Sequence, residues 1–125
     1  MISTKNLMRK NWFCFDNNYY QVGEVFDDGV SDINDEYAFF SVNDIQPIEL
    51  TTNILEDIGF VTEDGIMYDL NYDENEECSD FRLYKIANTF VMQTDFRTIA
   101  VDYVHVLQNL MGLCGVKKEI ENIWN

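Results

Sequence analysis

The most unusual feature of this 125-residue chain is a missing charge sign, because no Lys or Arg occurs between Asp16 and Asp80. That 65-residue stretch holds 19 of the 23 acidic residues, and all eight basic residues lie outside it. A net charge of −15 repels nucleic acids and anionic membranes and attracts basic proteins. Solubility is the simpler explanation of the acidity, but the complete lack of cations over this length favours partner binding. We therefore expect a basic protein partner, with no direct nucleic-acid or membrane binding.

Other scarce residue types exclude further classes of protein. One Pro and six Gly are too few for a fibre or a long linker, and no apolar run is long enough to cross a membrane. No apolar segment follows the charged residues near the amino terminus, so we expect no secretory signal. A hydrophobic content of 46% excludes a mainly disordered chain. We predict a single acidic binding domain over residues 1–125, with residues 1–11 as a flexible or short helical arm.

Cysteine and histidine are also scarce, which bears on metals and disulfides. Cys14, Cys78 and Cys114 form no CxxC pair, and His105 is the only histidine, so a zinc site would need scattered ligands. Reduced thiols in a cytoplasm fit this pattern. We predict no cofactor.

The sequence carries no catalytic motif. The P-loop, GxGxxG and GxSxG patterns are missing. His105 has no local set of nucleophile and orienting group beside it. With 23 acidic residues, some carboxylate pair falls at a catalytic separation by chance. We predict that the chain is not an enzyme.

Aromatic and β-branched runs bounded by turn residues predict strands. These runs are residues 12–15, 19–26, 37–42, 66–72, 81–87 and 89–93. The Asx-rich segment 16–18 predicts the turn of a hairpin, and residues 27–29 predict another turn. Residues 30–36 form an acidic stretch without a clear period, and the only proline, Pro47, lies in a connection.

Helical signals occur at three places. Thr51 is a candidate N-cap and Gly59 a candidate left-handed C′ residue, which predicts a helix of about two turns between them. A helical period runs from residue 99 to residue 113, and residues 117–124 predict a short terminal helix. The fold class is α+β, with an antiparallel, partly barrel-like sheet, a short middle helix and a longer C-terminal helix.

Calcium binding is the alternative chemistry for the acidic loop before residue 81. Residues 69–80 place oxygens at several positions of an EF-hand count. However, Glu74 occupies the position that needs Gly, and Asp80 replaces the bidentate Glu. The flanking segments also predict strands rather than helices. We therefore predict a solvated acidic loop with no metal.

Two acidic loops and the tyrosines beside them are the candidate partner-binding residues. Carboxylates steer a basic partner, whereas aromatic rings supply most of the binding energy. The candidates are Asp27, Asp28, Asp32, Asp35, Glu36, Tyr37, Tyr72, Asp73, Glu74, Glu76, Glu77 and Asp80.

Four segments resemble a group of small phage and prophage proteins with "PIPLT…LL…GF" and "YVHQLQNLY" patterns. They are residues 47–51 (PIELT), 54–55 (IL), 59–60 (GF) and 103–110 (YVHVLQNL). The resemblance covers residues 11–113, and the chain departs from it at Val106, where the group has Gln, and at Met111, where an aromatic is usual. These segments contain helix caps and packing faces, so the resemblance implies origin and fold rather than mechanism.

A phage origin joined to an acidic field leads us to expect an anti-CRISPR-like inhibitor in the cytoplasm of a bacterial host. Its carboxylates would act as a nucleic-acid mimic on a basic, nucleic-acid-processing defence nuclease, for example a type VI, RNA-targeting CRISPR effector. Three alternatives stay open. They are an immunity protein or antitoxin that neutralises a basic toxin, a phage structural or accessory protein, and a calcium-binding module.

Overall fold

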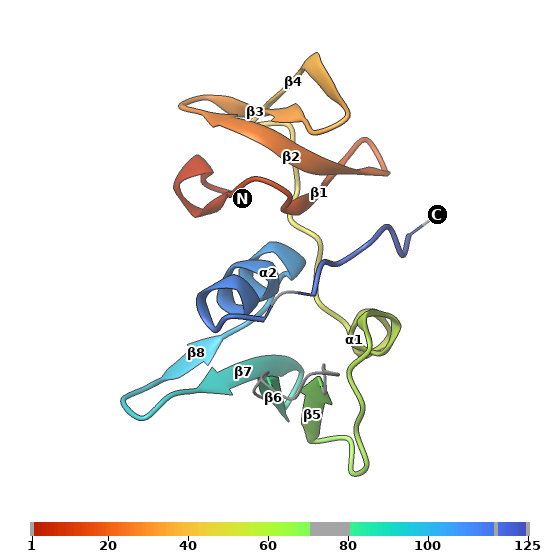
Figure 1. The fold of residues 1–125 in the computed structure, drawn as a ribbon, viewed down its shortest axis with the longest axis vertical. Coiled ribbons are helices and arrows are strands. Elements are labelled where there is room, and N and C mark those ends of the chain that lie inside the picture. The colour runs from red at the N-terminus through yellow and green to blue at the C-terminus, as the bar shows by residue number, and fades with distance from the viewer. Residues whose placement is uncertain (1, 71–80, 117, 125) are drawn as a thin grey trace. The chain divides into compact units, whose positions relative to one another are not determined.

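The computed structural model describes residues 2–70, 81–116 and 118–124 (Figure 1). Its contacts divide the chain into an N-terminal unit, Met1–Glu49 with Tyr103–Asn109, and a second unit, Leu50–Asp102 with Leu110–Asn125. The elements in chain order are η1 (Thr4–Asn6), β1 (Trp12–Phe15), β2 (Asn18–Phe26), β3 (Gly29–Asp32), β4 (Asp35–Ser41), α1 (Thr52–Ile58), β5 (Met67–Leu70), β6 (Phe81–Ile86), β7 (Thr89–Gln93), β8 (Thr98–Ala100) and α2 (Val104–Leu113).

The N-terminal unit contains an antiparallel sheet in the order β1-β2-β3-β4 (Figure 1). The predicted first hairpin is confirmed, since β1 pairs with β2 from Trp12 opposite Gln21 to Phe15 opposite Asn18. The two turn residues, Asp16 and Asn17, have φ values of 50° and 65°. Asx residues tolerate this left-handed conformation, which a tight hairpin turn needs at both central positions.

Strand β3 is the part of this sheet that the sequence did not predict. Residues 30–36 lack a clear period, yet Val30 and Ser31 are buried between β2 and β4. A bulge in β2 brings the Glu24 N–H to Ser31 Oγ at 2.9 Å, so the buried hydroxyl is satisfied locally. A strand of four residues with Gly and Ser among them has too weak a pattern to be recognised without its neighbours.

The core of the N-terminal unit lies on one face of this sheet, where buried side chains from the residues flanking η1, the first three strands and the β4–α1 connection meet. The ring of Phe13 packs against Tyr20 and Phe40, with centroid separations of 5.9 and 5.3 Å. The buried cluster consists of Ile2, Leu7, Phe13, Val22, Val30 and Ile45.

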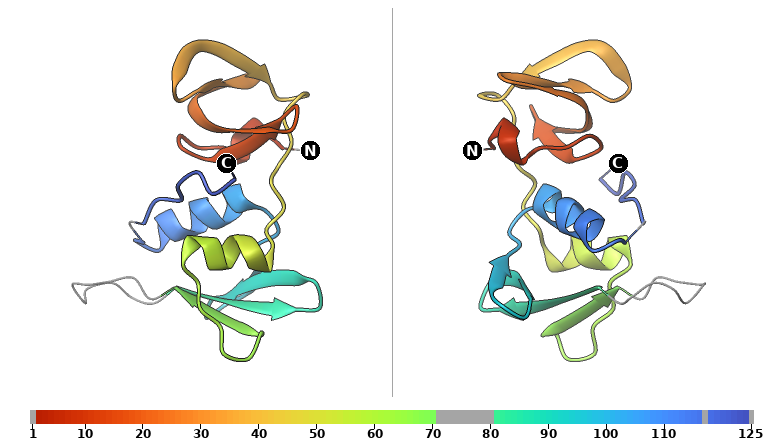
Figure 2. Two further views of the ribbon diagram at one scale, coloured as in Figure 1. Left: turned by 90° about the vertical axis from the view of Figure 1, so that its right-hand side faces the viewer. Right: turned by 60° about the vertical axis from the view of Figure 1, so that its left-hand side comes forward.

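The second unit contains another antiparallel sheet, in the order β5-β6-β7-β8. Figure 2 shows α1 and the C-terminal end of α2 on one face of this sheet. The predicted middle helix is confirmed at both ends. Thr51 Oγ1 accepts the Ile54 N–H at 3.2 Å, and Gly59 has φ 124°. The N–H groups of Gly59 and Phe60 bond back to the carbonyls of Glu56 and Leu55, a Schellman arrangement.

Two helix predictions need correction. The helical period at residues 99–113 is wrong at its start, because Thr98–Ala100 is strand β8 and α2 begins only at Val104. Pairing with β7 overrides the apolar spacing, which fits both conformations over so few residues. Described residues 118–124 form no helix, although Ile120 is buried. A helix of two turns is marginal without caps.

The α+β class with antiparallel pairing is confirmed. The strands are divided between two open four-stranded sheets. Within the described ranges no closed barrel forms, so the prediction of a partly barrel-like sheet needs correction. No helix in the described part of the chain has the length and apolar character that a membrane crossing needs. The expectation of one acidic binding domain stays a prediction.

Candidate partner-binding surface

Four of the five predicted acidic residues of the N-terminal unit lie at the two ends of the short strand β3. Asp27 and Asp28 form the β2–β3 turn, whereas Asp32 and Asp35 close the β3–β4 turn as opposed residues. Four strand steps separate Asp28 from Asp32, or about 13 Å. The other half of the predicted set lies outside the described residues. It comprises Tyr72, Asp73, Glu74, Glu76, Glu77 and Asp80.

The carboxylates of the β3–β4 turn also have a structural role. Asp32 Oδ1 accepts the Asn34 N–H at 2.9 Å, and Asp35 Oδ1 accepts the Tyr37 N–H at 3.0 Å. Each interaction occupies one carboxylate oxygen and leaves acceptor capacity on the other. Within the described part of the chain, no ion pair neutralises Asp27, Asp28, Asp32 or Asp35. Within the described residues, the charges of both turns are therefore not compensated by a neighbouring cation.

Two partly exposed aromatic rings from β2 and β4 contact each other in the region between these turns. Phe26 and Phe39 lie with ring centroids 6.1 Å apart, and they are 45% and 50% exposed. Gly29 makes this contact possible, because a Cβ at that position would fall 2.5 Å from Phe39 Cζ. Tyr37 precedes Phe39 by two residues and is 89% exposed. Exposed apolar side chains that are contiguous on one surface are typical of interaction sites, whereas single ones are common on any protein.

The register of the sheet explains why these rings face outward. Phe26 is opposite Gly29, and Ser31 is opposite Phe39, so the alternation of β-strands places both rings on one face. Val30 and its neighbour Phe40 take the other face and enter the core. We call Phe26, Asp27, Asp28, Asp32, Asp35, Tyr37 and Phe39 the acidic–aromatic surface.

The sequence identified the acids and Tyr37 of this surface but missed Phe26 and Phe39. The aromatic pair depends on the register of β3, which the sequence did not reveal as a strand. The signal that was present is the Phe-Asp-Asp-Gly turn, since a Gly directly after a turn leaves room for a ring from the neighbouring strand. Glu36, also predicted, is an exposed residue of β4.

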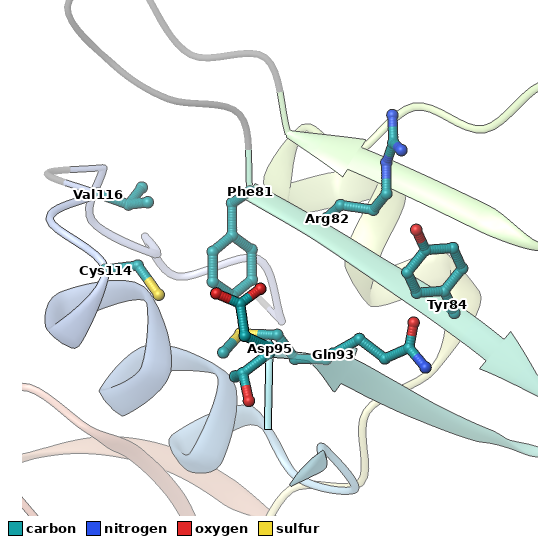
Figure 3. Close-up of a pocket in the computed structure, with 9 residues that line it drawn as sticks. Phe81, Arg82, Tyr84, Gln93, Asp95, Cys114 and Val116 are labelled. Carbon is teal, nitrogen blue, oxygen red and sulfur yellow. The ribbon is translucent and has the colours of Figure 1, made fainter. Parts of the chain in front are cut away.

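A second candidate is a cavity of about 590 Å³ in the second unit, drawn in Figure 3. Phe81, Cys114 and Val116 lie on one side of it, and Tyr84 lies on the other side (Figure 3). The guanidinium of Arg82, another lining residue, donates hydrogen bonds from Nε and Nη2 to the carboxylate of Asp69. These bonds raise the pKa of Arg82. The lining combines apolar side chains with charged side chains of both signs, which favours no particular class of ligand. We therefore assign no ligand to this cavity.

Asp69 is also the first position of the calcium count considered above. Its carboxylate holds Arg82, and the positions from residue 71 onward lie outside the described residues. Among the described side chains, no group of three or more His, Cys, Asp or Glu residues is placed to hold a metal.

The single histidine lies in the N-terminal unit and is buried. His105 is 4% exposed, and its ring stacks on Tyr103 with a centroid separation of 5.9 Å. Burial lowers the pKa of His105, so the ring is neutral at pH 7. Within the described residues, Nδ1 has no hydrogen-bond partner. No nucleophile is hydrogen-bonded to this nitrogen, and the absence of enzyme activity stays a prediction.

The side chains of Gln108 and Asn109 in segment 103–110 hydrogen-bond to distant parts of the backbone. Gln108 accepts the Trp12 N–H through Oε1 at 2.8 Å and donates from Nε2 to the Lys10 carbonyl at 3.0 Å. Asn109 donates to the Asn6 carbonyl at 2.9 Å. This part of the resembling segment therefore connects α2 to the first dozen residues.

Comparison with protein-family models, with curated proteins and with solved structures gave no match to this chain. Functional inference therefore depends on the acidic–aromatic surface itself.

Proposed function

We propose that this chain is a non-catalytic inhibitor that binds a basic, nucleic-acid-processing protein by direct contact, as expected for a phage protein acting on a host defence nuclease. The observation that carries the proposal is the acidic–aromatic surface. Exposed rings lie between two pairs of carboxylates, in a segment of sequence that contains no cation.

The two kinds of side chain contribute differently to binding. Carboxylates attract a positively charged surface over a Debye length of roughly 8 Å at physiological salt, which raises the association rate. Charge alone gives little affinity, because exposed ion pairs are screened by water and salt. Exposed rings such as Tyr37 and Phe39 supply apolar contact area, and aromatic residues dominate binding hot spots.

A nucleic-acid-binding channel is a suitable target for such a surface. Its Lys and Arg side chains are arranged to bind phosphates, and carboxylates spaced along a rigid sheet can occupy the same positions. An antitoxin would use the same electrostatics, so the identity of the partner must come from experiment.

The test is a binding and inhibition assay on a basic nuclease captured from the host and then purified. The quadruple variant Asp27→Asn, Asp28→Asn, Asp32→Asn, Asp35→Asn should associate roughly tenfold or more slowly at low salt and inhibit less. A matched control removes four charges at other exposed positions. It carries Glu49→Gln, Glu56→Gln, Asp57→Asn and Glu63→Gln.

The comparison between the two variants decides the outcome. Slower association confined to the first variant supports the proposal, because both variants change the net charge equally. Equal association of both variants and the wild type would show that the acidity serves only solubility.

A further inference from the structure

We infer that the acidic–aromatic surface selects arginine over lysine, and that its occupant is an arginine-bearing segment of the basic partner. This inference rests on the proposed function and adds the chemistry of recognition to it. It comes from exposed rings on β2 and β4 with carboxylates beside them on β4 and in the β2–β3 turn. The carboxylates attract either cation, whereas the rings favour arginine.

At one end of the surface, an aromatic ring directly precedes two acids. Phe26 is about half exposed, and its ring is tilted by 53° to that of Phe39. Both rings therefore keep exposed surface despite their contact. Asp27 and Asp28 follow in the turn, both exposed. A guanidinium stacked within about 6 Å of a ring centroid would therefore have carboxylates adjacent along the same hairpin.

At the other end, the ring and the carboxylate are joined by a hydrogen bond. Asp35 Oδ1 accepts the N–H of Tyr37, whose side chain is 89% exposed. This bond fixes the carboxylate near the backbone of the residue that carries the ring, while Oδ2 keeps its acceptor capacity. The surface thus has two places where a cation can meet both a ring and an acid.

Arginine fits these places better than lysine for physical reasons. Its guanidinium is planar, stacks on aromatic faces, binds carboxylates in two-point geometry and is weakly hydrated. The lysine ammonium is compact and strongly hydrated, so moving it onto a ring costs more desolvation. A charge-only surface would treat the two residues nearly alike.

Other occupants fit the surface less well. A second copy of the chain would bring its own uncompensated acidic residues to the same place, because residues 16–80 contain no cation. An apolar partner would remove water from the carboxylates around the rings without providing positive charges in return. A cationic segment satisfies both the rings and the acids.

The experiment uses the full chain and two synthetic peptides of equal length and charge, one with arginines and one with lysines at the same positions. Isothermal titration calorimetry should give about three- to fivefold tighter binding of the arginine peptide, and backbone amide NMR shifts should map to β2–β4. Both peptides should bind more weakly at high salt.

Aromatic variants then test the role of the rings. Tyr37→Leu, and separately Phe26→Leu with Phe39→Leu, should each lower the arginine preference and leave lysine binding nearly unchanged, because each removes the ring at one of the two places. Tyr37 is almost fully exposed, so its replacement tests the inference even if the double variant folds poorly. The control is Phe96→Leu, an aromatic residue of the second unit that is 95% exposed and precedes Arg97.

The outcomes separate this inference from the proposed function. Equal binding of both peptides, with loss of binding in the quadruple Asn variant, would overturn arginine selection and leave the basic-partner proposal standing. An arginine preference that is unchanged in the Leu variants would also overturn arginine selection and leave the basic-partner proposal standing. No binding of either peptide would overturn both proposals. Concentration-dependent dimerisation that Phe39→Leu abolishes would identify a second copy as the occupant and also overturn the inference.

Discussion

The side chain of Asn11 donates from Nδ2 to Oδ1 of Asn109 at 2.9 Å, joining residues 98 positions apart in the sequence. Asn11 is 2% exposed, and its own Oδ1 accepts the Met8 N–H at 2.8 Å. Asn109 in turn donates to the Asn6 carbonyl. These bonds hold the first dozen residues to α2 within the N-terminal unit, which carries the acidic–aromatic surface.

Replacing Asn11 by Ala should therefore destabilise the chain by about 1–3 kcal/mol, because buried polar groups lose their partners. Urea unfolding followed by circular dichroism measures the change. Asn53→Ala, an exposed position of α1, is the matched control and should stay within about 0.5 kcal/mol of the wild type. In the double variant with Asn109→Ala, the two losses should not add. Additive losses would show that the two side chains act independently.

The two helices offer a test of backbone conformation at glycine. Gly59→Ala should lower the free energy of unfolding by about 1–2 kcal/mol, because φ 124° is unfavourable for a side chain. Gly112→Ala should raise it by up to about 1 kcal/mol, since Gly112 is helical and a Cβ there meets nothing within 4 Å. Urea midpoints of the two variants should move in opposite directions. A shift of both in the same direction would contradict the helix boundaries.

Local signals explain which elements the sequence predicts. The Thr51 cap and the Gly59 terminus are interactions within a few residues of chain, and both are found as expected. Strand β8 was missed because Thr98–Ala100 becomes a strand only through pairing with β7. Strand β3 was missed for the same reason. Non-local pairing is the information that a pattern along one chain lacks.

The candidate surface shows the same limit. Its acids are visible as a charge bias in the sequence, and so is Tyr37. The contact between Phe26 and Phe39 depends on the strand register that places Gly29 beneath the Phe39 ring. The hydrophobic periodicity of the sequence does not reveal this register. The side chains of Gln108 and Asn109 hydrogen-bond to the backbone of distant residues, and the helical period of their segment does not reveal those partners.

Buried His105 makes a prediction about pH. Burial lowers its pKa from the ordinary 6.5, so the unfolded chain binds more protons than the folded chain as pH falls below 6.5. This contribution to stability is complete above pH 6.5 and is lost as pH falls through the lowered pKa. The slope reaches at most about 1.4 kcal/mol per pH unit for one proton.

The measurement is urea unfolding at pH 7.5, 6.5 and 5.5 for the wild type and for His105→Gln. Protonation of carboxylates acts on both proteins, so their difference isolates the histidine. The wild type should lose more stability than the variant over this range. Parallel curves would mean that His105 titrates equally in the folded and unfolded states.

The last prediction separates charge from hydrogen bonding at the β3–β4 turn. Asp32 and Asp35 each accept a backbone N–H through Oδ1, and an Asn side chain keeps that acceptor while removing the charge. The double Asn variant should match or exceed wild-type stability, because like charges that are opposed across the turn repel. The double Ala variant should lose about 1–3 kcal/mol in total, since two backbone N–H groups lose their acceptors.

Urea unfolding at low and high salt distinguishes these effects. A gain from Asn that disappears at high salt would be electrostatic, whereas the loss from Ala should persist. If the Asn variant were as unstable as the Ala variant, the charges themselves would hold the turn. Weaker partner binding by the quadruple Asn variant could then reflect a deformed surface. A stable Asn variant instead makes any loss of binding a direct measure of what the carboxylate charges contribute.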